Sequence, residues 1–113
     1  MQIITEKITL DELKKMSEKM HNNLVKAVVD IEMGIMAVDA GMHADEEMLL
    51  LEEGSQQENL WGINIHPYKS RDTWIEFDSM INLRPSFGNR TRGVDDINIQ
   101  EKIKKIVDAL VIE

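Results

Sequence analysis

The chain has 113 residues, 21 acidic against 13 basic side chains, a formal net charge of −8 at pH 7 and no cysteine. This length predicts a single domain over residues 1–113. The missing cysteine excludes disulfides, thiol catalysis and thiolate metal sites, and the negative charge repels nucleic acid, so that only a local contact with nucleic acid is compatible with it.

The sequence shows no targeting signal and no membrane-spanning stretch. The first residues lack a basic segment followed by an apolar run, and no part of the chain approaches the roughly 20 consecutive apolar residues that span a bilayer. We therefore expect a cytoplasmic protein that does not associate with membranes.

The first part of the chain predicts a strand, a helix and a hairpin. Residues 2–5 are apolar and favour a short strand. The segment Thr9–Glu12 matches a capping box, which predicts a helix near residues 10–21. Residues 24–32 and 35–39 are rich in Val, Ile and Ala and are joined by a short turn with glycine, which indicates an antiparallel hairpin.

The second part predicts a helix, a second hairpin and a closing helix. A helix is expected over about residues 42–53. Residues 60–65 alternate between two faces and lead through a polar turn into a long strand over residues 74–84. Residues 97–111 have helical spacing. The order β-α-β-β-α-β-β-α predicts an α+β fold, a two-layer sandwich in which three helices cover one face of a mainly antiparallel sheet of about five strands.

The long strand and the loop after it carry the main functional signal. Apolar and polar side chains alternate over residues 74–84, so one sheet face would be polar there. All four arginines lie between positions 71 and 92, and no acidic residue lies from 79 to 94. Because a guanidinium group holds a carboxylate or phosphate through paired hydrogen bonds, this positive segment of an acidic chain predicts an anion site.

The predicted ligand-binding residues are polar side chains of the last two strands and the loop: Asn64, Asp78, Asn82, Arg84, Asn89, Arg90 and Arg92. Gly62, beside Asn64, would leave room for a ligand to approach the backbone. A structural interpretation stays open, in which these arginines pair with carboxylates of the same chain or of a second copy.

A second candidate is a metal site. His43, Asp45, Glu76 and Asp78 offer one imidazole and three carboxylates, which suit a divalent cation such as Mg²⁺ or Mn²⁺ if the four side chains converge. In that case Arg84 would stabilise negative charge in a transition state. Acidic residues at the start of a helix also have an ordinary structural role, because they complement the positive end of the helix.

Three segments together resemble a known family. They are His43-Ala-Asp-Glu-Glu47, the segment 54–64 with its Trp-Gly-Ile-Asn end, and the segment 77–93 with Asn-Leu-Arg-Pro-Ser-Phe-Gly-Asn. This combination is similar to a family of small uncharacterised bacterial and archaeal proteins classed as a domain of unknown function, and the similarity spans nearly the whole chain. The resemblance implies a small cytoplasmic protein and supplies no catalytic residues.

We interpret the chain as a non-enzymatic binding or regulatory module that forms a homodimer and uses no cofactor. Its arginine loop would bind an anionic group of a small molecule or of a protein partner. Two alternatives stay open. One is a metal-dependent hydrolase or phosphoesterase, and the other is a structural oligomer subunit whose arginine loop makes salt bridges at an interface.

Overall fold

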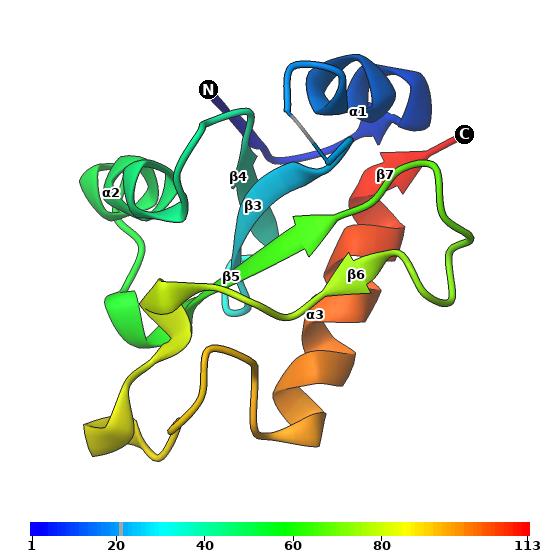
Figure 1. The fold of residues 1–113 in the computed structure, drawn as a ribbon. Helices are drawn as coiled ribbons and strands as arrows, with labels where there is room; N and C mark the ends of the chain where they lie inside the picture. The colour runs from blue at the N-terminus through cyan, green and yellow to red at the C-terminus, as the bar shows by residue number, and fades with distance from the viewer. Residues whose placement is uncertain (21) are drawn as a thin grey trace.

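The computed structural model describes residues 1–20 and 22–113 (Figure 1). The helices, with η for a 3-10 helix, and the strands follow one another in this order: β1 (Gln2–Ile4), β2 (Ile8–Thr9), α1 (Leu10–Ser17), β3 (Val25–Asp30), β4 (Ile35–Val38), α2 (His43–Glu52), η1 (Gln57–Asn59), β5 (Leu60–Ile65), β6 (Ile75–Glu76), η2 (Met80–Asn82), η3 (Pro85–Phe87), α3 (Ile97–Leu110) and β7 (Val111–Ile112).

The main sheet has five strands in the order β1-β4-β3-β5-β6, and each neighbouring pair is antiparallel. β3 lies at its centre, where Val28 is opposite Ala37 on one side and Gly62 on the other. β2 and β7 form a separate parallel pair in which Ile8 is opposite Val111. This pair joins the end of α3 to the segment that leads into α1. The predicted α+β class and the mainly antiparallel sheet of five strands are confirmed.

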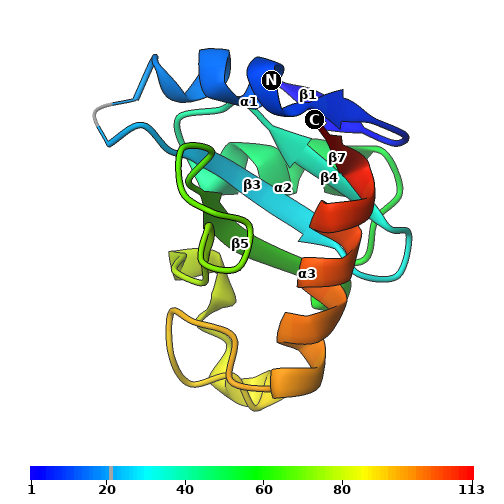
Figure 2. The same cartoon turned by 90° about the vertical axis from the view of Figure 1, so that its right-hand side faces the viewer.

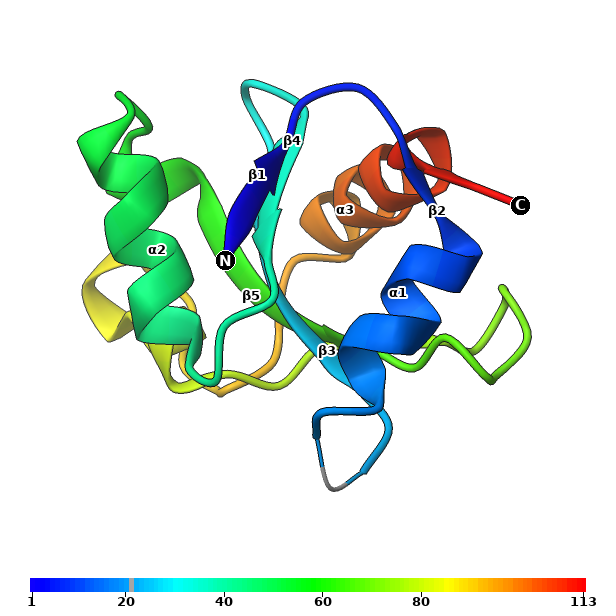
Figure 3. The same cartoon turned by 90° about the horizontal axis from the view of Figure 1, so that it is seen from above.

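Helices cover both faces of the main sheet (Figure 3). α1 and α3 lie on one face, over a core that includes Ala27, Val29 and Ile63, and Figure 2 shows both helices in front of the sheet with α2 behind it. On the other face Leu50 of α2 packs against Val28 and its neighbours. The two-layer sandwich is not confirmed, because α2 forms a third layer.

Local sequence signals account for the helix boundaries. The hydroxyl of Thr9 accepts a hydrogen bond from the backbone N–H of Glu12 at 3.1 Å, and the Glu12 carboxylate accepts from the Thr9 N–H at 2.9 Å, which completes the capping box. Gly54 follows α2 with a φ of 104°, a conformation that glycine adopts without strain. α1 ends at Ser17, earlier than predicted, and His21, the last residue of the predicted helix, lies outside the described residues.

The long strand predicted over residues 74–84 is wrong. β6 contains only Ile75 and Glu76, although it pairs with β5 as expected. The chain then leaves the sheet at Ser79, whose hydroxyl accepts from the Ile81 N–H at 3.3 Å and starts η2. The alternation of apolar and polar residues is interrupted at Ser79 and Met80, which is where the strand has been replaced by a helical turn.

α2 covers only part of its sheet face. Under the helix this face is apolar, whereas beside the helix it carries Lys26, Asn64 and Glu76, which lie directly opposite one another on β3, β5 and β6. We call these three residues the polar row. Among the described residues, no helix combines the length and the apolar character needed to cross a membrane.

One carboxyl group of α2 is buried without a cationic partner. Glu46 is fully buried; its Oε2 accepts from the backbone N–H of Ala40 at 3.1 Å, and its Oε1 has no partner in the described part of the chain. Burial raises the pKa of Glu46 to about 9. The side chain is therefore protonated at neutral pH.

We expect Glu46→Gln to stabilise the protein at pH 8 and to have little effect at pH 4. The pKa of Glu46 lies near 4.5 in the unfolded chain and at about 9 in the folded chain, so wild-type stability falls as pH rises between these values. The glutamine side chain of the variant does not ionise and so avoids this loss of stability. The free energy of unfolding at pH 8 should therefore rise by at least about 1 kcal/mol. Urea denaturation at both pH values measures it. The exposed Glu52→Gln is the control, and an equal effect of Glu46→Gln at both pH values would contradict the burial argument.

Candidate functional site

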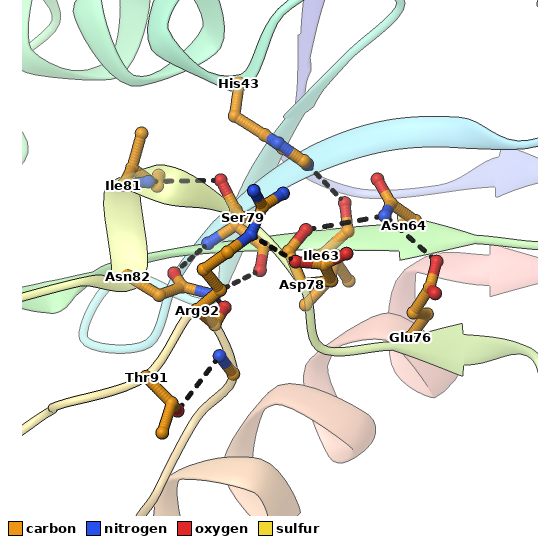
Figure 4. Close-up of polar contacts among 12 residues, drawn as sticks. His43, Ile63, Asn64, Glu76, Asp78, Ser79, Ile81, Asn82, Thr91 and Arg92 are labelled. Carbon is orange, nitrogen blue, oxygen red and sulfur yellow. Dashed lines mark hydrogen bonds and ion pairs between the residues drawn. The ribbon is translucent and has the colours of Figure 1, made fainter.

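A recess of about 260 Å³ with polar and apolar lining lies between the start of α2, the Lys26 and Asn64 positions of the polar row, and the segment that leads into η2. We call it the α2 recess. The polar and charged side chains that line it come from five different parts of the chain, and Figure 4 shows all of them but the first: Lys26, His43, Asn64, Asp78, Ser79 and Arg92.

His43, the first residue of α2, is held as a neutral ring. Its Nε2 lies 2.7 Å from the backbone oxygen of Ile63, so this nitrogen carries the proton and donates. Burial lowers the pKa of His43, and the charges of Lys26 and Arg92 act in the same direction. The imidazole is therefore uncharged at neutral pH, and its Nδ1 keeps a lone pair.

Asn64 is buried with one side of its amide unsatisfied. Its Nδ2 donates to Oε1 of Glu76 at 3.0 Å and to the backbone oxygen of Asp78 at 3.4 Å. Oδ1 has no hydrogen-bond partner in the described residues, although the residue is only 6% exposed. Hydrogen bonds from Asn64 and then from His66 lower the pKa of Glu76, which stays ionised at neutral pH.

Asp78 and Arg92 form an ion pair at the mouth of the recess. Arg92 Nε donates to Asp78 Oδ1 at 2.7 Å, and the two side chains are 55% and 44% exposed. An ion pair this exposed contributes little to stability. Because only Nε is engaged, the two terminal nitrogens of the guanidinium remain for another acceptor (Figure 4).

The start of α2 also faces the recess. Met42 is the N-cap residue, its thioether is only a weak hydrogen-bond acceptor, and no side chain in the described part of the chain caps the helix. The first N–H groups of a helix have no partner within the helix, and Met42, His43 and Ala44 all line the recess. An uncapped helix N-terminus of this kind is a natural position for an anion.

Lys26 contributes a second full positive charge. It lies opposite Asn64 in the register of β3 and β5 and is half-buried at the edge of the recess. None of the ion pairs within residues 1–20 and 22–113 includes Lys26. The predicted site residues did not include Lys26. Its position opposite Asn64 depends on the register between β3 and β5. That register cannot be predicted from the sequence of either strand alone.

Of the predicted ligand-binding residues, Asn64, Asp78 and Arg92 line the recess, while the others lie elsewhere. Asn82 is fully buried and completes the sheet edge: its Oδ1 accepts from the Gly62 N–H at 2.8 Å, and its Nδ2 donates to the Gly62 oxygen at 2.9 Å. The same Nδ2 donates to the backbone oxygen of Arg92 at 2.9 Å. The Asn82 amide therefore replaces the strand backbone that β6 no longer supplies.

The space beside Gly62 is not open to a ligand. A Cβ atom on Gly62 would lie 2.6 Å from Cβ and Oγ of Ser79. The glycine is needed because the turn into η2 packs directly on β5.

We expect Gly62→Ala to destabilise the protein by roughly 1 to 3 kcal/mol, because the added methyl group must displace Ser79 and disturb the Asn82 hydrogen bonds. Gly41→Ala is the matched control, since its Cβ would meet nothing within 4 Å. Thermal and urea denaturation of both variants measure the difference, and equal stabilities would contradict the packing described for Ser79.

Asn89 holds the arginine loop together. It is buried, its Nδ2 lies within hydrogen-bond distance of the backbone oxygens of Asn82, Thr91 and Gly93, and its Oδ1 accepts from the Asp95 N–H at 2.8 Å. With these partners inside the loop, Asn89 is not available to a ligand.

Arg84 is bound to the protein itself. Its guanidinium lies 4.4 Å from the ring centre of Trp61 and donates to the backbone oxygens of Gln57 and Leu60. Arg71 repeats this arrangement over Trp74, at 4.4 Å, and donates to the Val111 oxygen. Arg90 is exposed, and its side chain makes no hydrogen bond or ion pair within the described residues.

We expect Arg84→Lys to lower stability by about 1 to 2 kcal/mol, because an ammonium cannot make both backbone hydrogen bonds while lying flat on Trp61. Arg90→Lys, the matched control in the same loop, should change stability by less than about 0.5 kcal/mol. Melting temperatures by circular dichroism compare the two. If only Arg90→Lys lowered the melting temperature, the roles assigned to Arg84 and Arg90 would be wrong.

Of the four residues of the metal alternative, His43 and Asp78 both line the α2 recess, while the other two lie elsewhere. Asp45 lines a different hollow with Met48 and Glu52, while Glu76 bonds to Asn64 and His66. Among the described residues, no three His, Asp or Glu side chains are placed to hold a metal ion. The side-chain positions therefore give the metal-dependent hydrolase no support.

The fold and the recess together define the class: an α+β domain whose five-stranded sheet is covered by helices on both faces, with a polar recess where one helix leaves the sheet open. The sequence model of one protein family matches residues 2–110, and its description is protein of unknown function (DUF5674). The chain belongs to this family, which confirms the resemblance to an uncharacterised family. Searches of the curated proteins and of the solved structures found no match.

Proposed function

We propose that the protein is a non-enzymatic binding module that holds the anionic group of a small molecule, a carboxylate or a phosphate, in the α2 recess. The observation that carries this proposal is the meeting of three positive elements at one hollow: the uncapped N-terminus of α2, Lys26 and Arg92. This keeps the anion binding expected from the arginine loop but moves it from Arg84 to Arg92.

The electrostatics of the recess support this choice. A helix N-terminus is equivalent to about half a positive charge, and its free N–H groups point along the helix axis. Lys26 and Arg92 add full charges, and the neutral His43 adds none. Asp78 offsets part of this field, but its Oδ1 is already engaged by Arg92. The ionised Glu76 of the polar row and Asp45 in the first turn of α2 also lower the potential, so an anion would be held by direct contact with Lys26, Arg92 and the helix N–H groups.

We retain the homodimer and the cytoplasmic location as proposals. Of the arginines in the predicted loop, Arg84 and Arg92 have partners within the chain, which leaves Arg90 for the salt bridges of the structural-subunit alternative. This weakens that alternative relative to the binding module.

Inorganic phosphate should shift the backbone amide resonances of residues 41–44, Asn64 and Arg92 in a titration followed by ¹H–¹⁵N NMR. Lys26→Gln and Arg92→Gln should each weaken the binding about tenfold, because each removes a charged donor.

Lys69→Gln and Arg90→Gln are the matched controls, since they remove the same charges from exposed positions outside the recess. Phosphate affinity that falls equally in all four variants would show a general charge effect, and shifts scattered over the whole surface would refute the site.

A further inference from the structure

The α2 recess presents hydrogen-bond acceptors beside its donors, and this restricts the ligand further. The clearest acceptor is Oδ1 of Asn64. Both groups that meet Nδ2, the Glu76 carboxylate and the Asp78 backbone oxygen, can only accept, so the orientation of the amide is fixed. Figure 4 shows the oxygen pointing away from Glu76. It has no partner among the described residues, but it lies beneath the surface of the recess, so a ligand N–H group reaches it only if the neighbouring side chains move.

Two further acceptors line the same recess. The Nδ1 atom of His43 has a free lone pair, because Nε2 must carry the proton that it donates to Ile63. Asp78 uses Oδ1 for Arg92, and its Oδ2 makes no hydrogen bond within the described residues. The recess therefore combines cationic donors with one charged and two neutral acceptors.

A simple anion would satisfy only half of these groups. Phosphate or acetate would pair with Lys26, Arg92 and the α2 N-terminus and would place its charge next to Asp78 without relief. A ligand that carries an ammonium group beside its anionic group would meet both sets at once. Molecules that carry these two groups on one carbon are α-amino acids.

We propose that the α2 recess binds a small zwitterion of the amino-acid class, with its carboxylate toward Lys26, Arg92 and the start of α2 and its ammonium toward the exposed carboxylate of Asp78. This inference rests on the proposed function and names its ligand class. The size of the recess agrees with it: about 260 Å³ corresponds to roughly nine water volumes, enough for a single amino acid.

The test compares three related probes on the full chain. They are L-norvaline; valerate, which lacks the ammonium group of norvaline; and butylammonium, which lacks its carboxylate group. ¹H–¹⁵N NMR titrations give the affinity of each and the residues that it touches. We expect norvaline to bind at least about tenfold more tightly than valerate, and butylammonium not to bind. The shifts should centre on residues 41–44, Asn64, Asp78 and Arg92.

Asp78→Asn removes the charged acceptor and keeps an oxygen for Arg92. This variant should lose the preference for norvaline over valerate and should bind valerate at least as well as the wild type does. Asp11→Asn, on the exposed side of α1, makes the same change in net charge outside the recess and should leave the preference intact.

The outcomes separate the two proposals. Equal affinities of norvaline and valerate at the recess would overturn the zwitterion and leave the anion site standing. A preference that survives in Asp78→Asn would overturn the role given to the acceptors. If neither phosphate nor any of the three probes shifts the recess resonances, the anion site itself is refuted. The comparison of probes on the wild-type chain holds even if Asp78→Asn does not fold.

Discussion

The carboxamide of Asn82 joins the sheet to the loop that follows it, and the recess depends on this connection. With one side chain it bonds to both backbone groups of Gly62 on β5 and to the backbone oxygen of Arg92. Asn89 continues the network by donating to the backbone oxygen of Asn82. Because these groups are buried, the hydrogen bonds form without competition from water, and they place Ser79 and Arg92 beside the start of α2.

The arginines of this chain divide into two kinds according to what lies beneath them. Arg71 and Arg84 lie on the two tryptophans and donate to backbone oxygens, and Arg71 also pairs with Asp108 and Glu113, so both arginines are engaged by the protein itself. Arg92 has no aromatic ring below it and uses one nitrogen on Asp78. Arginines that are close together in the sequence therefore have different roles in the structure. The second cation at the recess, Lys26, comes from a strand far from Arg92 in the sequence.

Much of the fold could be predicted because its signals are local. The capping box at Thr9, the alternation over residues 60–65 and the helical spacing of residues 97–110 each act within a few residues. The side of the sheet that α2 covers could not be predicted. Leu50 is buried while Met48 and Leu51 are exposed, so apolar residues lie on several sides of the helix and do not indicate which side faces the sheet. The structural role of Asn82 could not be predicted for a similar reason: it bonds across 20 residues to Gly62, and no short sequence pattern indicates such a contact.

The hydrogen bonds between Asn82 and Gly62 of β5 have a consequence for solubility. A strand whose N–H and C=O groups are free at the edge of a sheet is a template for another chain, and proteins that leave such edges exposed tend to form intermolecular sheets. At Gly62 both groups are occupied by the Asn82 carboxamide, which has no further backbone to offer a neighbour. Because β6 is only two residues long, it leaves this part of β5 without a neighbouring strand on this side. The Asn82 side chain occupies the position and so prevents a strand of another molecule from pairing with β5 there.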